Sequence, residues 1–189
     1  TVSHRGESVY QATQEDLMLF VKDSAGNWQP DSVLTNPLNT PYNEGSPAFS
    51  ADGRYLFFVA ADRKDGLGSC DIYYVIRHGN RWSLPIHASA PLNTRFWESN
   101  PSLSADGRTL FFASNRPGGK GGMDIWKCRV ALQSDGLLLF FNAENLGDSI
   151  NTAKNEMSPF IHPDNETLYF SSNGHGGVGG NDIFVARQN

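Results

Sequence analysis

The stretch that decides the fold is Glu98-Ser-Asn-Pro-Ser-Leu-Ser-Ala-Asp-Gly-Arg-Thr-Leu-Phe-Phe-Ala-Ser-Asn-Arg116, because related versions of it return along the chain. Its proline marks the spacing: Pro47, Pro101 and Pro159 stand 54 and 58 positions apart. The repeated units cover residues 39–73, 93–126 and 151–184. A period of a few tens of residues indicates a solenoid, a propeller or another repeat array.

A fourth, partial copy precedes these units. Asp16-Leu-Met-Leu-Phe lies 55 positions before Asp71-Ile-Tyr-Tyr-Val, so the opening segment corresponds to the second half of a unit. We therefore expect a single domain over residues 1–189. It consists of a partial blade, residues 1–38, followed by three repeats, residues 39–92, 93–150 and 151–189.

Each unit is expected to form four short antiparallel strands. In the second unit, residues 102–104 and 109–114 flank Asp106-Gly107, a hairpin signal because both residues tolerate positive φ. The strand after this turn is apolar on both faces, with Leu110 and Phe112 on one and Phe111 on the other. A strand buried on both faces suits a sheet packed between two sheets, so the fold class is all-β, a β-propeller of four-stranded antiparallel blades. A β-sandwich would not explain the returning phrase.

About 3.5 to 4 units are present, against the four to eight blades that are usual. Three arrangements remain open. Residues 9–13 can supply a degenerate strand so that four blades close, the chain can be part of a larger ring, or two chains can complete one ring.

Composition limits the function. The hydrophobic content of 39% and aromatic content of 12% are typical of a folded domain. The net charge of -5 without a basic run argues against nucleic-acid binding. The longest apolar stretch, residues 137–141, is too short to span a bilayer, and the N-terminus lacks the order of a signal peptide, so any targeting segment is expected to have been removed or to lie outside this chain. Cys70 and Cys128 occupy different places in successive units and are expected to be free thiols.

In such a propeller the loops that lead into each blade share one face with the loops between the second and third strands. That face gathers the candidate binding residues Glu44, Glu98, Glu156, Arg63, Arg116, Lys120, His175, Phe96 and Trp97.

The three glutamates occupy one register, three residues before each repeated proline. They can form an acidic ring at the channel mouth that holds a cation or a basic partner. Alternatively, each carboxylate accepts backbone N–H groups or pairs with a neighbouring arginine and fastens the blades together. The identical register favours fastening, since a substrate site usually breaks a repeat. Phe96-Trp97, by contrast, is unique to its loop, and it is either a binding hot spot or a cover over the adjoining blade edge.

The glycine-rich segments 118–124 and 176–182 allow a calcium interpretation, because glycines let oxygen ligands curl around a hard cation. Their few carboxylates favour the alternative, a tight loop whose Asp caps its own turn. The five histidines lack metal-ligand spacing, and there is no Gly-x-Ser-x-Gly nucleophile elbow. We expect no cofactor, no metal site and no catalytic residue.

The pattern Ser-Pro-x-x-Ser-x-Asp-Gly-x-x-Leu-x-Phe-x-Ser-Asn-Arg, followed by a glycine-rich loop and Asp-Ile-Tyr, resembles the WD40-like repeats of TolB-type β-propellers over nearly the whole chain. The third copy departs from it, with Asn165 in the turn and Gly174 where Arg116 stands. The segments 171–184 and 146–152 are similar to propeller segments of PorE-type, OmpA-family envelope lipoproteins of the type IX secretion system. That resemblance implies a periplasmic, outer-membrane-associated protein whose peptidoglycan contact is made by a domain absent from this chain.

Two functions follow as expectations. The first is a non-catalytic β-propeller that acts as a protein–protein interaction scaffold in a bacterial cell-envelope complex, with other envelope proteins as partners. The alternative is a glycan- or peptide-processing propeller enzyme with its site at the channel mouth, for which Glu98, Arg116 and His175 are the available groups.

Overall fold

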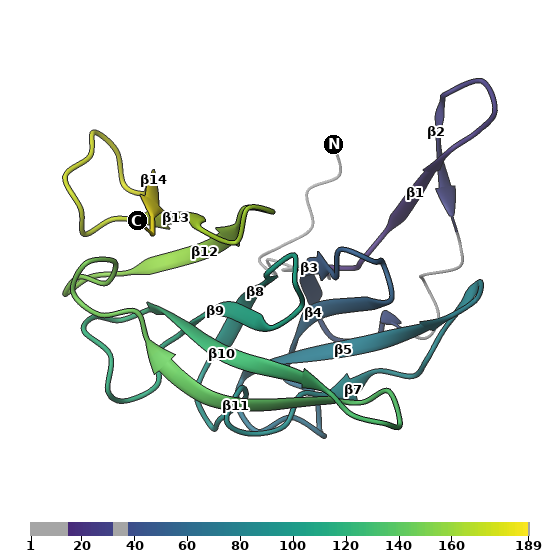
Figure 1. Ribbon diagram of the computed structural model, residues 1–189, viewed down its shortest axis with the longest axis horizontal. Helices are drawn as coiled ribbons and strands as arrows, with labels where there is room; N and C mark the ends of the chain where they lie inside the picture. Colours follow the sequence, from purple (N-terminus) through teal and green to yellow (C-terminus); the bar gives the residue numbers. More distant parts are fainter. Residues whose placement is uncertain (1–14, 32–37, 189) are drawn as a thin grey trace, which may run out of the picture.

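The computed structural model describes residues 15–31 and 38–188, and all of the strands in these ranges pair antiparallel within their sheets. The alternative strand over residues 9–13 lies outside the described residues. Figure 1 shows four sheets placed one after another around an arc, with β1–β2 at one end and β12–β14 at the other. The β-propeller prediction is confirmed as a partial propeller.

The four sheets differ in their number of strands. The first is a hairpin of β1 (Leu19–Lys22) and β2 (Trp28–Asp31). The second contains β3 (Glu44–Phe49), β4 (Tyr55–Ala61) and β5 (Cys70–His78), with the short strands β6 (Arg81–Trp82) and β7 (Ile86–His87) along β5. The third has the four expected strands: β8 (Glu98–Leu103), β9 (Thr109–Ser114), β10 (Asp124–Leu132) and β11 (Leu138–Asn145). The last has three: β12 (Glu156–Ile161), β13 (Thr167–Ser172) and β14 (Asp182–Arg187).

The hairpin turns lie where the sequence places them. Gly107 has φ of 69° between β8 and β9, a backbone conformation that costs glycine little. In the third unit Asn165 takes this conformation with φ of 61°, which explains why that turn can dispense with Asp-Gly. The departure of the third copy from the repeat therefore changes the residue and keeps the turn.

The core consists of layers between neighbouring sheets rather than one central cluster. Phe57 on β4 packs with Leu110 and Phe112 on β9. Leu56 and Phe58, on the other face of β4, pack against Leu17, which lies just before β1. The third layer joins Ala113, Ile125, Ile161, Leu168 and Phe170 from the last two sheets. Each inner sheet is thus buried on both faces, as a propeller blade requires.

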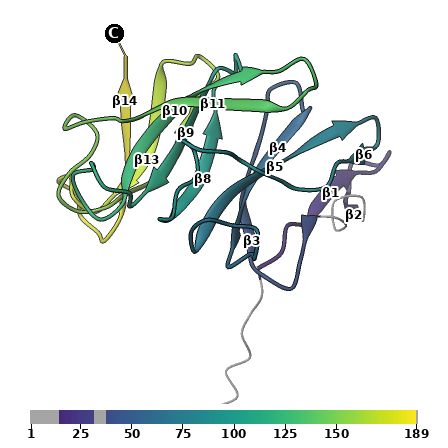
Figure 2. The ribbon, with the colours of Figure 1, turned by 90° about the horizontal axis from the view of Figure 1, so that it is seen from below.

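One face in the last blade differs from this expectation. Tyr169 on β13 is 39% exposed, whereas its counterpart Phe57 is fully buried. In the described residues no further sheet follows β14, and Figure 2 shows β13 and β14 at one end of the molecule and β1–β2 at the other. The apolar character of both faces, visible in the sequence, is satisfied on only one face here.

Candidate functional site

The repeated glutamates are buried at the start of each blade. Glu98 is fully buried, and its carboxylate accepts hydrogen bonds from the Thr94 backbone N–H at 2.8 Å and the Thr94 hydroxyl at 2.7 Å. The Ser114 hydroxyl donates a third bond at 2.8 Å, which ties β8 to β9. A carboxylate that accepts several bonds inside the protein is satisfied without a ligand.

The other two glutamates repeat this arrangement. Glu156 accepts from the Thr152 N–H, the Thr152 hydroxyl and the Ser172 hydroxyl at 2.6–2.8 Å. Glu44 accepts from the N–H and hydroxyl of Thr40. All three side chains are at most 1% exposed, so they do not line an open channel mouth. This geometry matches the alternative in which each carboxylate is bonded inside the protein and fastens the blades together.

Arg116 lies beside Glu98 and is nearly as buried. Its Nη2 is 3.0 Å from Glu98 Oε1, and its guanidinium also donates to the backbone carbonyls of Pro91 and Leu92. It stacks over Phe112 and Trp126 at 4.8 and 5.3 Å from the ring centroids. Burial lowers the pKa of Arg116, and the charge of Glu98 opposes this shift. The pair therefore holds the β8–β9 strands against the segment that leads into the blade.

Arg63 and His175 occupy related positions in the neighbouring blades. Arg63 lies over the Tyr73 ring at 4.5 Å and pairs with Asp65 at 3.0 Å. His175 packs against Phe170 and Phe184, and its Nε2 lies 2.8 Å from the Ile150 carbonyl oxygen. Of the predicted glutamates, arginines and His175, the structure brings only Glu98 and Arg116 together as an ion pair within the described ranges. Lys120, the remaining cation, pairs with Asp148 at the surface.

The asparagine that opens each repeat is a structural residue that was not predicted from the sequence. Asn93 accepts a bond from the Ile72 N–H at 2.9 Å and donates to the Ile72 carbonyl at 2.7 Å, so its amide binds the edge of the preceding blade. Asn39 and Asn151 bind Leu17 and Ile125 in the same way. The identical register of these asparagines in the repeat was the available signal.

The glycine-rich loops are held by their own aspartates. The Asp71 carboxylate accepts from the N–H groups of Leu67 and Gly68 at 3.0 Å. Asp124 binds the N–H groups of Lys120 and Gly121, and Asp182 binds that of Gly179. These bonds correspond to the loop-capping alternative to calcium. Among the described residues no group of three or more His, Cys, Asp or Glu side chains is placed to hold a metal ion.

Close packing between blades explains two of these glycines. A Cβ on Gly68 would lie 1.8 Å from the Phe96 carbonyl oxygen, and one on Gly121 would lie 1.9 Å from that of Lys154. Both oxygens belong to the loop that leads into the next blade. Glycine is required there because the two backbones touch.

Trp97 is, with Lys120, one of the two predicted site residues that remain open to solvent. It is 43% exposed, whereas Phe96 beside it is half-buried. The Trp97 backbone forms a parallel bridge with Cys70, and its backbone N–H donates to Asn115 Oδ1 at 2.9 Å. These contacts fix the position of the backbone that carries the indole. Trp97 lines a cavity of about 340 Å³ between the second and third blades.

The Trp97 cavity is framed by three blades and by the segment before β1. Its lining includes Glu15, Asn43, Asn100 and Met157 beside Trp97. A tryptophan, a thioether and one exposed carboxylate together suit an apolar side chain with a nearby basic group. Sequence analysis identified Trp97 but not the others, because they come together only through the packing of successive units.

A second hollow lies along the first strands of the second, third and last blades. It has a volume of about 370 Å³ and is lined by the Ser/Asn-Pro segments of β3, β8 and β12. Ser46, Asn100 and Ser158 stand in one register there, each with φ of 51–52° at a β-bulge. Bulges of this kind bend an inner strand and aim its side chains.

Both cysteines are free and buried. Burial raises the pKa of Cys70 to about 11 and that of Cys128 to about 12, so both thiols stay protonated at neutral pH. Neither cysteine has the lowered pKa of a nucleophile.

The described residues contain no helix long and apolar enough to cross a membrane.

No protein-family model and no curated protein match this sequence. Among solved structures, the chain is similar to TolB from Acinetobacter baumannii, with 17% identity and a TM-score of 0.52 over 90% of this chain and 35% of that one. It is also similar to a putative TolB from Agrobacterium tumefaciens, with 21% identity and a TM-score of 0.50 over 82% of this chain and 49% of that one. The chain thus has the fold of a TolB-like β-propeller. It spans between a third and a half of the length of those two proteins.

Proposed function

We propose that this chain is a non-catalytic β-propeller module that binds a protein partner at the Trp97 cavity. The observation that carries the proposal is the contrast between Trp97 and its neighbours. The glutamates, Arg116 and His175 have partners inside the protein, whereas Trp97 presents an indole at the rim of a cavity. Exposed tryptophans in rigid settings are the side chains that most often anchor protein interfaces.

The partner proposed for this cavity is a polypeptide segment with an apolar side chain next to a lysine or arginine. The apolar side chain would fill the space between Trp97 and Met157, and the basic group would approach the exposed Glu15 carboxylate. The charge pair would guide the encounter, and burial of the indole would supply most of the affinity.

A photo-reactive amino acid at position 95, which is exposed two residues before Trp97, tests this function in cells that carry the native gene. The cross-linked partner is identified, purified and titrated against the wild-type chain and the Trp97→Ala variant. We expect Trp97→Ala to weaken binding by at least tenfold, in line with the cost of removing a hot-spot side chain. Leu84→Ala is the matched control, because Leu84 is 74% exposed and lies outside the cavity. Equal affinity of the two variants would contradict the proposal.

We further propose a place for the chain in a bacterial cell-envelope complex, in the periplasm and associated with the outer membrane. The support is the resemblance of residues 146–152 and 171–184 to PorE-type propeller segments, together with the TolB-like fold. Sequencing the coding gene across both ends of this segment tests the assignment. Further repeats followed by an OmpA-like domain would support it, and an unrelated domain would remove it.

The absence of a catalytic role is also part of the proposal. Glu98, Arg116 and His175, the groups available to a hydrolase, are each bonded to the protein itself. We expect Glu98→Ala to lower the free energy of unfolding. We expect no hydrolytic activity from either the wild-type chain or this variant. Turnover of any glycan or peptide by the wild-type chain that Glu98→Ala abolishes would overturn this view.

A further inference from the structure

The outer hairpin of the third blade, where β10 turns into β11, lies against the second blade (Figure 2). The Tyr55 hydroxyl of the second blade donates to the Gly136 carbonyl in the turn of this hairpin at 2.8 Å. The Leu138 N–H donates to the Tyr74 hydroxyl at 3.2 Å. The outer part of the second blade is built differently, from the two-residue strands β6 and β7. The hairpin therefore departs from the repeat, and such a departure is where we expect a ligand site.

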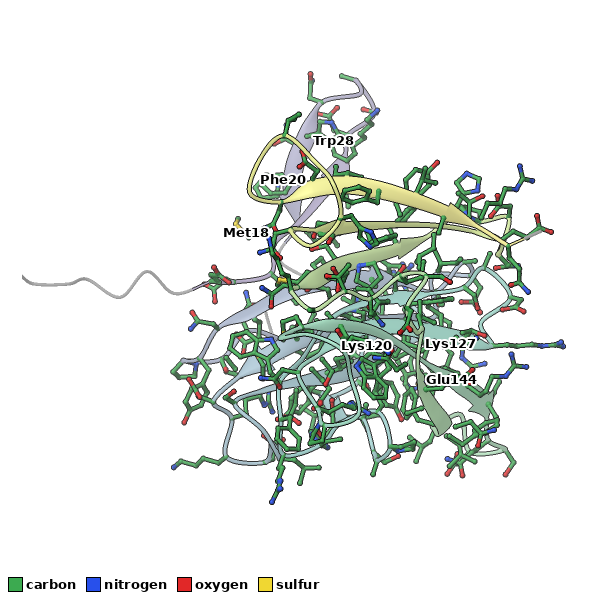
Figure 3. All side chains as sticks on the ribbon, turned by 90° about the vertical axis from the view of Figure 1, so that its left-hand side faces the viewer. Met18, Phe20, Trp28, Lys120, Lys127 and Glu144 are labelled. Carbon is green, nitrogen blue, oxygen red and sulfur yellow. The ribbon has the colours of Figure 1, made fainter. Side chains whose placement is uncertain are left out.

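Further contacts hold this hairpin in place. The Phe140 ring packs against Phe57 and Tyr74 of the second blade, with ring centroids 6.4 and 6.1 Å apart. Towards the other end of the hairpin, the Lys127 ammonium on β10 lies 3.1 Å from the Glu144 carboxylate on β11, and Figure 3 shows the two side chains together. The arrangement of the second and third blades around the hairpin is therefore formed without a ligand.

A cavity of about 290 Å³ lies beside the tip of this hairpin, between the second and third blades. Its apolar wall consists of Tyr55, Leu103, Val130, Leu132 and Leu138. Three of these side chains are less than 9% exposed, whereas Leu132 is 58% exposed. A cavity of roughly 150 Å³ is enough to hold benzene, so this one has room for an apolar group with a short polar extension.

The charge of the cavity lining comes from two aspartates. Within the described part of the chain, Asp52 and Asp106 are the only charged side chains that line the cavity. Oδ1 of each accepts the hydroxyl of the serine two positions before it and the N–H two positions after it. The serine bond is the main cause that lowers the pKa of both aspartates, so both are charged at neutral pH. The neighbouring Arg54, Arg108 and Arg129 are exposed and do not line the cavity.

The two aspartates are also incompletely used by the protein. In the described residues, Oδ2 of Asp52 and Oδ2 of Asp106 take part in no hydrogen bond or ion pair. They stand in the same register of neighbouring repeats, 54 positions apart, so the packing of the two blades brings both carboxylates to one cavity. A free carboxylate oxygen beside an apolar wall suits a ligand that has a cationic group on an apolar body.

We propose that this cavity binds a small organic ammonium ion, with its apolar part against the leucine and tyrosine wall and its ammonium group at Asp52 and Asp106. Removal of the apolar part from water supplies affinity, and the carboxylates select for positive charge. The volume is at the lower end of the range for small-ligand sites, roughly 300–1,000 Å³, which favours a free amine over a polypeptide segment. The cavity and Trp97 lie at opposite ends of β8, so this site is separate from the proposed protein-binding site.

A titration of the 189-residue chain with hexylammonium chloride, followed by ¹H–¹⁵N correlation spectra, tests this site. We expect saturable shifts of the Ala105, Gly107 and Leu138 amides, with a dissociation constant of about 1 mM or below. 1-Hexanol has the same chain without the charge and should bind at least about tenfold more weakly. Nα-acetyl-lysine methylamide, which carries the ammonium group on a peptide unit, should bind more weakly than hexylammonium.

Matched variants separate the charge from the fold. Asp52→Asn/Asp106→Asn keeps an oxygen that can accept the turn bonds, and it should weaken hexylammonium binding at least about tenfold while leaving 1-hexanol binding unchanged. Asp164→Asn is the control, because Asp164 occupies the same register in the last blade and does not line the cavity. It should bind hexylammonium as the wild type does. Unchanged spectra away from the substituted turns confirm that each variant is folded.

Several outcomes would overturn the proposal. One is the absence of saturable shifts at these amides with tens of millimolar hexylammonium, and another is a set of shifts confined to the Trp97 cavity. Equal affinity for hexylammonium and 1-hexanol, or unchanged affinity in the double aspartate variant, would remove the role of the carboxylates. Tighter binding of Nα-acetyl-lysine methylamide than of hexylammonium would replace the free amine with a lysine side chain of a polypeptide.

Discussion

The third and the last blades are built from the same repeat, yet corresponding side chains have different surroundings in the two blades. Ile125 and Ile183 hold the same place in the repeat, but Ile125 is fully buried and Ile183 is 81% exposed. Glu98 has an arginine beside it, whereas Glu156 forms no ion pair within the described residues, because Gly174 replaces Arg116. The repeat therefore specifies the blade, while the neighbouring blade decides what each side chain contributes.

The largest single effect is expected at the buried glutamates. Glu98→Ala leaves the buried Arg116 guanidinium without its counter-charge and should lower the free energy of unfolding by about 3–5 kcal/mol. Glu156→Ala leaves only neutral donors without an acceptor and should cost about 1–3 kcal/mol. Urea unfolding of both variants measures the difference. Equal losses would show that the ion pair adds nothing to the fastening arrangement.

The paired isoleucines give the next largest effect. Ile125→Ala removes a fully buried side chain and should cost about 2–5 kcal/mol. Ile183→Ala should change stability by less than about 0.5 kcal/mol in dilute solution, since surface substitutions rarely do more. The measurement is urea unfolding at low protein concentration. A large loss at Ile183 would mean that this side chain is buried in solution.

A smaller contrast is expected between loop glycines. Gly121→Ala places a Cβ 1.9 Å from the Lys154 carbonyl oxygen and should cost about 1–3 kcal/mol through displacement of the two backbones. Gly180→Ala in the last blade meets nothing within 4 Å and should be nearly neutral. Thermal unfolding compares the two. If both variants melt alike, the close approach between blades is not a constraint.

The smallest effect concerns Cys128, whose counterpart in the last blade is Ala186. Its folded pKa of about 12 lies above the ordinary value of 9.0, so its contribution to stability is present below pH 9 and is lost as the pH rises towards 12. By pH 10 the loss should be on the order of 1 kcal/mol, and Cys128→Ala should remove this part of the pH dependence. Guanidinium unfolding at pH 8 and pH 10 checks it. An unchanged slope in Cys128→Ala would assign the loss to other groups.

Much of the fold could be predicted from the repeat, while the site could be predicted only in part. Asp106-Gly107 and the apolar run after it indicated a hairpin and a doubly covered strand, and β8 and β9 confirm both. Trp97 was recognised because it breaks the repeat. Met157 and Glu15 were not, because their approach to Trp97 depends on the packing of blades far apart in the sequence.

The array of blades follows from the amino-acid sequence alone, because turn residues and apolar strands act over a few neighbouring positions and recur at a fixed period. Which polar groups are bonded internally and which surfaces are free depends on how the blades pack together. Glu98 and Trp97 are adjacent in sequence, yet one is buried within its blade and the other lines a cavity, because burial depends on what packs against each side chain.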